Sequence, residues 1–454
     1  MKKTCAILVL IAWGSWWTWG GRCADPSNAA PMPDGIPEQV RQKDTTPDPH
    51  LLGCEMPAEE NAALLRQQLL QRLGVDRWHE AGFRGQGVKI ALLDSGFRGY
   101  RAHLGKTLPA KVRTQSFRFD GQLEGKDSQH GILCGEILHA LAPEAELLLA
   151  AWEPNNPAQF LKAVRWAKEQ GARVLSCSVI IPSWSDGAGG GHIHQELRGI
   201  LGTGDEPADV LFFASAGNTA QRHWHGRFRD NGQGYHDWHD GIIDNKVYPW
   251  DNQRLSVELY WNSEARYQVV VQDDDSGERV AQASAVCPGQ HYCAAARFQP
   301  QASRCYRVRV KLVSGPPGPF HLVVLGGHLT YRHSAGSIAF PADGEHVVAV
   351  GAVDAAGERM SYSSCGGAAT PKPDFVGVVP FPSVWRPRPF SGTSAAAPQA
   401  AALAALWWSR HPHWTAAQTR AALQRHAIDL GPPGHDIETG HGLITLPTAG
   451  LSEQ

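Results

Sequence analysis

Four polar residues in this chain of 454 residues are of the types that acyl transfer requires. In chain order they are Asp94, His130, Asn218 and Ser394. A serine hydroxyl becomes a nucleophile when an imidazole removes its proton, and a carboxylate fixes the tautomer of that imidazole. An asparagine side chain can donate a hydrogen bond to the oxyanion that forms. Together, the four groups could cleave an amide or ester bond through an acyl-enzyme.

Each of these residues also has an ordinary structural explanation, and for a single residue that explanation is the better one. Asp94 could be a turn residue or a cap, and His130 could be one surface histidine among 21. Asn218 follows a glycine and could occupy a left-handed turn, while Ser394 could be a helix N-cap. The catalytic interpretation therefore depends on a fold that brings all four residues together.

The elements predicted around the four residues place them at one edge of a sheet. The apolar run Val88–Leu93 indicates a buried strand that leads directly to Asp94. A second predicted strand, Val210–Ala214, comes shortly before Asn218. The imidazole and hydroxyl candidates each open a predicted helix. Because ligands of open parallel sheets bind beyond the carboxyl ends of the strands, we expect the four side chains to meet there.

Strands and helices alternate over most of the chain, which predicts an α/β fold with a mostly parallel, doubly wound sheet. The other predicted strands are Glu146–Ala151, Arg173–Ile181 and Val347–Val353. The predicted helices are Leu65–Leu73, Gly131–Leu141, Pro157–Gln170 and Thr393–Trp408.

Residues 222–333 interrupt this alternation. Short runs with a period of two are separated by turn signals such as Asp275-Ser-Gly277, and no helical period is apparent. The predicted strands are Leu255–Trp261, Tyr267–Gln272, Tyr306–Leu312 and Phe320–Leu325. This pattern predicts an antiparallel β-sandwich inserted between two parts of the α/β domain, residues 64–221 and 334–454.

Several motifs resemble those of the subtilisin-like serine proteases, the subtilases. The most specific is Gly392-Thr-Ser-Ala-Ala-Ala-Pro398. The motifs Ala91-Leu-Leu-Asp-Ser-Gly96, His130-Gly131 and Ala214-Ser-Ala-Gly-Asn218 agree with it, in the chain order known for that family. The resemblance covers about residues 64–221 and 334–447. The insert is similar to the jelly-roll domains that some bacterial subtilases carry between the Asn and Ser motifs.

The resemblance implies a role for each residue. Asp94 would orient His130, which would act first as the general base and then as the general acid. Ser394 would attack the substrate, and its amide would form the oxyanion hole together with Asn218. The residues implied to bind substrate around the primary specificity pocket are Ser178, Val179, Ile180, Ser215, Ala216 and Gly217.

Two departures from the family pattern have consequences. Ile180 stands where the family usually has a glycine at the pocket rim, so we expect a narrow pocket that favours small side chains. The family's usual insertion after the His helix, which forms a strong calcium loop, is missing before Ala142-Pro143. We therefore expect no calcium site of that kind.

The N-terminus has the pattern of a secretory signal peptide. Lys2 and Lys3 precede a short apolar run, and small residues suited to cleavage follow at about 24–30. A membrane anchor is the alternative, but the run is short for a bilayer span. Residues 31–63, rich in proline, are expected to form a flexible arm, too short for the folded inhibitory prodomain usual in the family. The sequence therefore predicts a secreted or periplasmic protein with no stable membrane span after signal removal.

Metal, cofactor and nucleic-acid functions are not favoured. With 42 basic and 44 acidic residues, the net charge of −2 does not suit a nucleic-acid binder. The histidine-rich stretch that contains His223, His225, His236, His239 and Asp240 could ligate zinc, but it is more simply a polar loop. Asp273-Asp-Asp275 is interpreted as a solvated turn rather than a calcium cage. Cys287, Cys293 and Cys305 could supply a disulfide whose pairing the sequence leaves open.

The sequence thus predicts a monomeric, cofactor-free serine endopeptidase that acts on proteins or peptides. The alternative is a catalytically impaired subtilase scaffold that binds protein or glycan through the inserted sandwich. A lipase-type hydrolase is discounted because its histidine would follow the serine in the chain.

Overall fold

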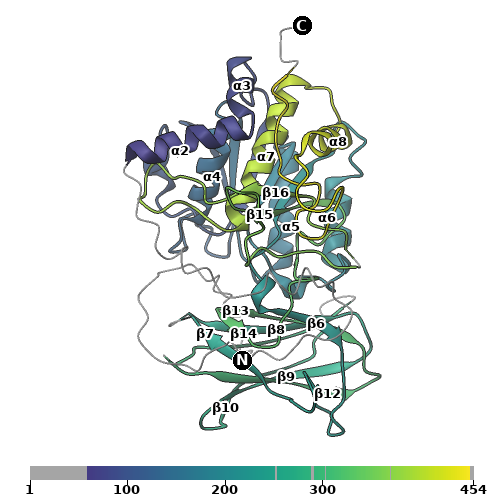
Figure 1. Cartoon of the computed structure of the whole chain (residues 1–454). Helices are drawn as coiled ribbons and strands as arrows, with labels where there is room; N and C mark the ends of the chain where they lie inside the picture. The colour runs from purple at the N-terminus through teal and green to yellow at the C-terminus, as the bar shows by residue number, and fades with distance from the viewer. Residues whose placement is uncertain (1–58, 251–252, 288–290, 302, 369, 450–454) are drawn as a thin grey trace.

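The structure is a computed structural model that describes residues 59–250, 253–287, 291–301, 303–368 and 370–449. An α/β unit occupies one end of the molecule and a unit built of β-strands occupies the other (Figure 1). The expected signal peptide, 1–30, and residues 31–58 of the expected arm lie outside the described residues. Within the described residues, no helix combines the length and the apolar character that a membrane crossing requires.

The α/β unit is built on a sheet of seven strands, all of whose neighbours are parallel. The strands are β1 (Lys89–Asp94), β2 (Arg113–Phe117), β3 (Glu146–Trp152), β4 (Val174–Cys177), β5 (Leu211–Ser215), β15 (Val347–Val353) and β16 (Phe375–Val378). Their order is β16-β15-β5-β4-β1-β3-β2. β3 pairs with β1 on one side, and β4, the next strand in the chain, pairs with β1 on the other side. The carboxyl end of β1 is therefore the topological switch point where α/β sheets bind ligands.

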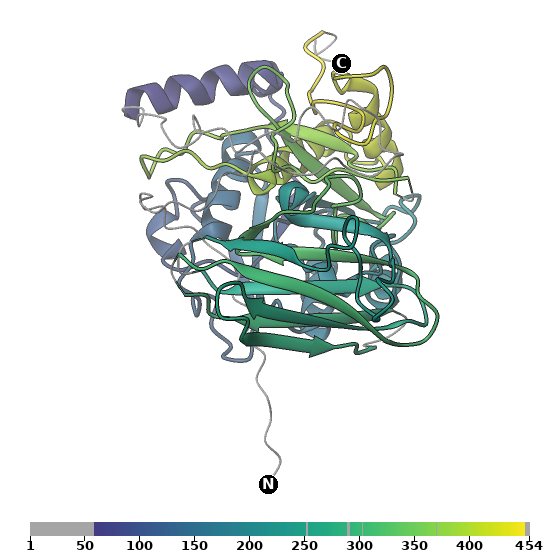
Figure 2. The same ribbon diagram turned by 60° about the horizontal axis from the view of Figure 1, so that its bottom comes forward.

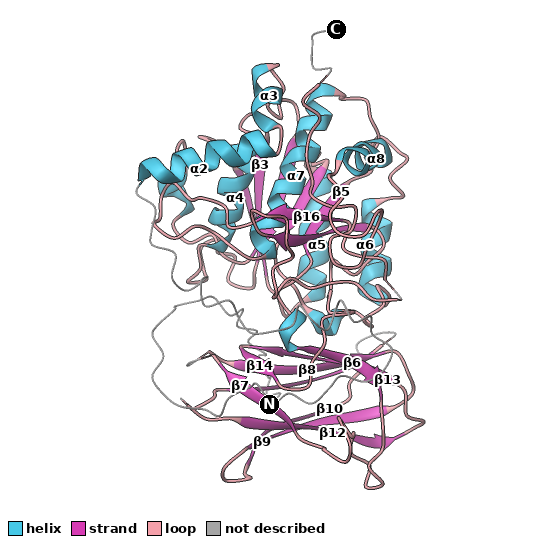
Figure 3. Ribbon diagram, in the orientation of Figure 1, coloured by secondary structure: helices cyan, strands magenta, loops and turns pink. Residues whose placement is uncertain are grey.

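Helices cover both faces of this sheet, as the doubly wound prediction requires (Figure 3). Ile90 and Leu92 of β1 belong to the core beneath α4 and α7, whereas Ala91 and Leu93 belong to the core beneath α5 and α6. The helices are α2 (Glu59–Arg72), α3 (Val75–Glu80), α4 (His130–Leu141), α5 (Pro157–Glu169), α6 (His192–Leu201), α7 (Thr393–Arg410) and α8 (Ala416–His426). Short 3-10 turns are η3 (Tyr100–His103), η4 (Pro182–Trp184) and η5 (Ala220–Arg222).

Two antiparallel sheets form the second unit and lie face to face (Figure 2). The five-stranded sheet has the order β10-β9-β12-β7-β14 and the four-stranded sheet has the order β11-β8-β13-β6. The strands are β6 (His223–Arg227), β7 (Asn245–Pro249), β8 (Leu255–Trp261), β9 (Arg266–Asp273), β10 (Arg279–Ser284), β11 (Tyr292–Phe298), β12 (Tyr306–Ser314), β13 (Pro319–Leu325) and β14 (Gly327–Leu329). One apolar core, which includes Val257 from one sheet and Val269 from the other, fills the space between them. The inserted β-rich unit expected from the sequence is therefore present.

Several elements differ from the predictions: residues 59–63, expected in the flexible arm, belong to α2, and β2, β16 and α8 are not among the predicted elements. The predicted strand Arg173–Ile181 is too long, because β4 ends at Cys177. Beyond that point the chain leaves the ladder, and the Ile181 amide donates to the carbonyl of Phe340 at 2.9 Å. A further difference is β6, whose sequence His-Trp-His-Gly-Arg lacks the apolar alternation of a strand but pairs with β13 in an antiparallel ladder.

Candidate active site

Asp94 and His130 form a buried pair at the switch point of the sheet. Asp94 is the last residue of β1 and His130 is the first residue of α4. The imidazole Nδ1 of His130 donates to Oδ2 of Asp94 at 2.5 Å, and neither side chain is exposed to solvent. The other carboxylate oxygen, Oδ1, accepts from the amides of Ser95 and Gly96 at 2.8 and 2.9 Å. The carboxylate is thus fixed on both oxygens, and it fixes the imidazole tautomer with Nε2 left for chemistry.

Two glycines permit this close approach of β1 and α4. A Cβ atom on Gly131 would lie 2.5 Å from the ring of Phe97, and one on Gly96 would lie 2.3 Å from Oγ of Ser128. The Gly131 amide donates to the carbonyl of Gly96 at 2.7 Å, which ties the two segments together. The glycines that follow the carboxylate and the imidazole in sequence are therefore needed for packing.

Ser394 lies in the first turn of α7, where helix amides have no partner within the helix. Pro398 stands four residues later and has no N–H to donate to the Ser394 carbonyl. That carbonyl instead accepts from Oγ of Ser178 at 3.2 Å and from Sγ of Cys134 at 3.6 Å. The missing helical bond is thus replaced by bonds from two other segments, which hold the start of α7 in place.

Cys134 links the imidazole to the helix that carries Ser394. Its sulfur lies 3.9 Å from Nε2 of His130 and 3.6 Å from the Ser394 carbonyl oxygen. The ring of Phe390, which precedes α7, lies edge-on to the His130 ring with 5.4 Å between centroids. The fold therefore brings the predicted carboxylate, imidazole and hydroxyl residues to one place.

Asn218 adjoins the same helix start. Its side-chain oxygen accepts from both the amide and the hydroxyl of Thr393 at 3.0 Å each. Because Thr393 bonds to the side-chain oxygen, the NH₂ group is the part of the Asn218 carboxamide that could donate to a ligand. Gly392 has φ of +88°, and a Cβ atom there would lie 3.0 Å from Nδ2 of Asn218. A glycine at position 392 therefore keeps the space beside the donor open.

Cys134 itself could be taken for a nucleophile, since it lies beside the imidazole. Burial raises the pKa of the Cys134 thiol well above its ordinary value, and the nearby negative charge of Asp94 raises it further. A thiol held in the protonated form is a poor nucleophile. Ser394, which is only partly buried, is the better candidate. Asp94, His130 and Cys134 also form the one group of metal-type donors that converges among the described residues.

The predicted substrate-binding residues lie on both sides of this helix start. Ser178 contacts Ser394 in both directions, because the Ser394 hydroxyl also donates to the Ser178 carbonyl at 3.3 Å. A Cβ atom on Gly217 would lie 3.4 Å from Cδ1 of Ile180, so these two residues face each other. Val179, Ser215 and Ala216 are buried as whole residues.

The histidine-rich stretch does not converge on one point. His236 is buried in the β-rich unit among Trp224, Trp238 and Phe320. His223 and His225 both contact His321, at 3.0 Å between ring nitrogens for His223 and at 4.0 Å between ring centroids for His225, and His239 pairs with the adjacent Asp240. The one group of metal-type donors that converges among the described residues includes none of the five residues named for zinc.

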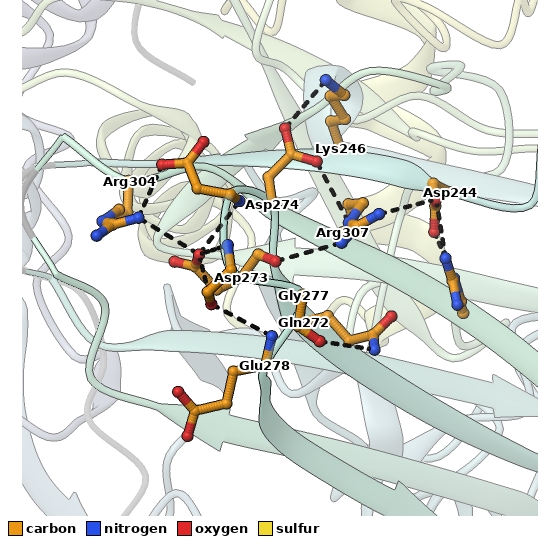
Figure 4. Close-up of polar contacts among 12 residues, drawn as sticks. Asp244, Lys246, Gln272, Asp273, Asp274, Gly277, Glu278, Arg304 and Arg307 are labelled. Atoms are coloured by element: carbon orange, nitrogen blue, oxygen red, sulfur yellow. Dashed lines mark hydrogen bonds and ion pairs between the residues drawn. The ribbon is translucent and has the colours of Figure 1, made fainter.

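The Asp273–Asp275 turn is part of an ion-pair network on the five-stranded sheet, drawn in Figure 4. Asp274 pairs with Lys246 and Arg307 at 3.0 and 3.3 Å. Arg304 lies 3.4 Å from Asp273 and 2.7 Å from Asp275. These carboxylates are neutralised by basic side chains, which agrees with a structural turn.

Some residues of the site were not identified from the sequence. No role is predicted from the sequence for Cys134, Thr393 or Pro398. The serine motif contains Thr393 and Pro398, but only the paths of β5 and α4 show which atoms the start of α7 meets.

Comparisons with known proteins agree with the geometry. The profile of the subtilase family matches residues 85–288 and 330–442. Subtilisin from Bacillus pumilus is 35% identical over 122 residues, which cover 26% of this chain and 41% of that protein. Subtilisin E from Bacillus subtilis (strain 168) is 34% identical over 122 residues, or 26% of this chain and 30% of that protein. The matched stretch thus spans less than half the length of these curated relatives.

Among solved structures, the CspB protease of Clostridium perfringens superposes with a TM-score of 0.59 at 13% sequence identity. The alignment covers 83% of this chain and 97% of that one. At this level of identity the similarity concerns the fold.

Proposed function

Since the chain belongs to the subtilase family, we propose that it is a serine endopeptidase that hydrolyses peptide bonds through an acyl-enzyme on Ser394. The observation that carries the proposal is the fully buried Asp94–His130 pair, 2.5 Å apart, beside the helix start that bears the serine. A buried carboxylate that fixes a histidine next to a partly exposed serine is the arrangement needed to activate a hydroxyl.

In the first half of the reaction, Nε2 of His130 takes the proton of the Ser394 hydroxyl as Oγ bonds to the substrate carbonyl carbon. The carbonyl oxygen becomes an oxyanion and accepts from the Asn218 amide and the Ser394 backbone N–H. When the tetrahedral intermediate collapses, the C–N bond breaks and His130 gives its proton to the departing amine. Asp94 remains ionised and stabilises the imidazolium.

In the second half, a water molecule replaces the amine. His130 takes a proton from the water as its oxygen bonds to the acyl carbon, and then returns a proton to Oγ of Ser394 as the ester bond breaks. The products are a carboxylic acid and the free enzyme. These groups supply nucleophile, base and oxyanion donors, so the proposal includes no cofactor.

The contact of Ile180 with Gly217 supports a narrow primary specificity pocket. A branched side chain at that place reduces the volume available to the substrate, so the proposed preference is for small residues before the cleaved bond. Cleavage of a peptide library predominantly after large aromatic residues would contradict this preference.

We further propose that the protein is exported as a monomer and that residues 222–333 fold as a domain inserted into the catalytic domain. The basic N-terminus followed by an apolar run supports export. The separate core between the two antiparallel sheets supports the domain assignment.

The direct test is hydrolysis of an unfolded protein by the purified chain, with the fragments identified by mass spectrometry. New termini should appear with the native protein and be absent with Ser394→Ala. If the native protein cleaves nothing and yet binds protein or glycan through the sandwich, the scaffold alternative replaces the endopeptidase.

A further inference from the structure

Asn218 is held at both of its carbonyl oxygens. Thr393 holds the side-chain oxygen, as described above, and Nε of Arg222 donates to the backbone oxygen at 2.9 Å. Arg222 ends η5, the short turn that carries the chain from Asn218 to the first strand of the sandwich. The backbone position of the proposed oxyanion donor thus depends on an arginine four residues away.

The sandwich holds this arginine. The Arg222 guanidinium lies over the ring of Trp250, 4.5 Å from its centroid. Trp250 follows β7, and its amide donates to the carbonyl of Gly326 at 2.9 Å. The Trp250 ring also lies edge-on to His328 of β14, with 5.2 Å between centroids. A chain of contacts therefore runs from β14 through the indole and the guanidinium to Asn218.

Arg222 carries a positive charge close to the Asn218 backbone. Within the part of the chain that the structure describes, no acidic side chain lies within ion-pair distance of it. Burial lowers the pKa of Arg222 to about 10, so the group stays cationic at neutral pH. Burial, and then the charges of Arg222 and Arg332, lower the pKa of His328 to about 4, so that this histidine is neutral there. Among the described residues, the positive charge that contacts the Asn218 backbone is therefore not paired with a carboxylate.

We propose that Arg222 is a positioning residue for the oxyanion hole, held in place by Trp250 of the inserted sandwich. It fixes the backbone of Asn218 and adds a positive potential where negative charge develops during acyl transfer. The insert is accordingly part of the catalytic apparatus, because it holds the group that orients the oxyanion donor. This inference rests on the proposed function.

The test compares Arg222→Gln and Trp250→Ala with the native enzyme on a peptide ester or amide. A positioning role predicts that kcat falls about tenfold or more while KM changes less than twofold, since the lost interaction acts in the transition state. The inhibition constant of a peptide boronic acid, which forms a tetrahedral adduct with serine, should rise by a similar factor. Trp250→Phe should retain most of the activity because it keeps an aromatic face for the guanidinium.

Arg266→Gln is the matched control. Arg266 also lies over an aromatic ring of the sandwich, Tyr292, at 3.9 Å, and also donates to backbone carbonyls. Arg266→Gln should lower the melting temperature, because it removes a comparable contact of the sandwich. It should leave kcat per titrated active site unchanged.

The outcomes separate the two proposals. If the native protein cleaves peptide and Arg222→Gln has the same kcat per active site, titrated with a fluorophosphonate, the positioning role is wrong and the endopeptidase stands. If Arg222→Gln does not fold, Trp250→Ala tests the positioning role instead. An unchanged kcat and an unchanged affinity for the boronic acid in Trp250→Ala would also show that the role is wrong. If the native protein neither cleaves peptide nor reacts with fluorophosphonate, both proposals fail.

Discussion

At the scale of single residues, the site depends on atoms that the regular elements leave without partners. Pro398 deprives the Ser394 carbonyl of its helical bond, and Ser178 and Cys134 supply the replacement. The Thr393 amide, unpaired in the first turn of α7, bonds to Asn218. The same irregularities that weaken the helix start therefore connect it to β4, α4 and the turn after β5.

Replacing Asn218 with alanine should lower kcat by about 100- to 1,000-fold with little change in KM, because the donor acts on the oxyanion. Steady-state kinetics on a peptide substrate measure both constants. Thr393→Val, which removes only one of two bonds to the Asn218 oxygen, should cause a smaller loss, and Thr393→Ser should restore it. A parallel rise in KM for Asn218→Ala would instead assign the side chain to ground-state binding.

At the scale of elements, helix α2 is bonded to the segment that precedes Ser394. Arg66 of α2 bonds to the carbonyl of Pro382 at 2.6 Å and pairs with Glu136 of α4 at 2.5 Å. Glu136 is buried and also accepts from the Ser383 hydroxyl at 2.8 Å and from the Trp385 indole at 2.9 Å. One carboxylate thus joins α2, α4 and the hairpin that ends at Phe390.

Glu136→Gln should destabilise the protein by about 3 kcal/mol, because it leaves the Arg66 guanidinium partly buried without a counter-charge. Urea unfolding followed by circular dichroism measures the loss. The double variant Arg66→Met, Glu136→Gln should be more stable than Glu136→Gln alone. Equal stability of the single variant and the native protein would show that the pair contributes nothing.

Elements with a strong local pattern were predictable and those defined by tertiary contacts were not. The runs Ile90–Leu93 and Val347–Val353 are continuously apolar, so their burial in a parallel sheet follows from composition. The end of β4 is set by a bond to Phe340, about 160 residues away in the chain, which no local pattern reveals. The same holds for the candidate site. Its carboxylate, imidazole and hydroxyl residues could be predicted from their chemical types and motifs, whereas the contacts of Cys134 and Arg222 depend on residues far away in the chain.

At the scale of the whole molecule, several histidines are buried without charge. Burial, followed by the charge of Arg229, lowers the pKa of His236 to about 3, and burial also lowers the pKa of His223 and His321 well below the usual value. The unfolded chain binds protons on these groups below about pH 6.5, whereas the folded chain does not. Folding stability is therefore fully present above pH 6.5 and is lost progressively as the pH falls toward 3.

For His236 alone this linkage amounts to about 2 kcal/mol at pH 5. We expect the melting temperature of the native protein to fall between pH 7 and pH 5, and to fall less for His236→Phe. The solvent-exposed His413→Phe serves as the control and should keep the native pH dependence. Identical pH profiles for the native protein and His236→Phe would show that this histidine is protonated within the fold.

If the fold activates the hydroxyl of Ser394, as proposed, the native protein should react with a fluorophosphonate at that residue. After incubation at neutral pH and proteolytic digestion, mass spectrometry should find a single phosphonylated residue, Ser394, with stoichiometric labelling of the native protein. His130→Ala should label far more slowly, and Ser394→Ala should not label. A native, folded protein that remains unlabelled, or one labelled equally after loss of His130, would contradict the account.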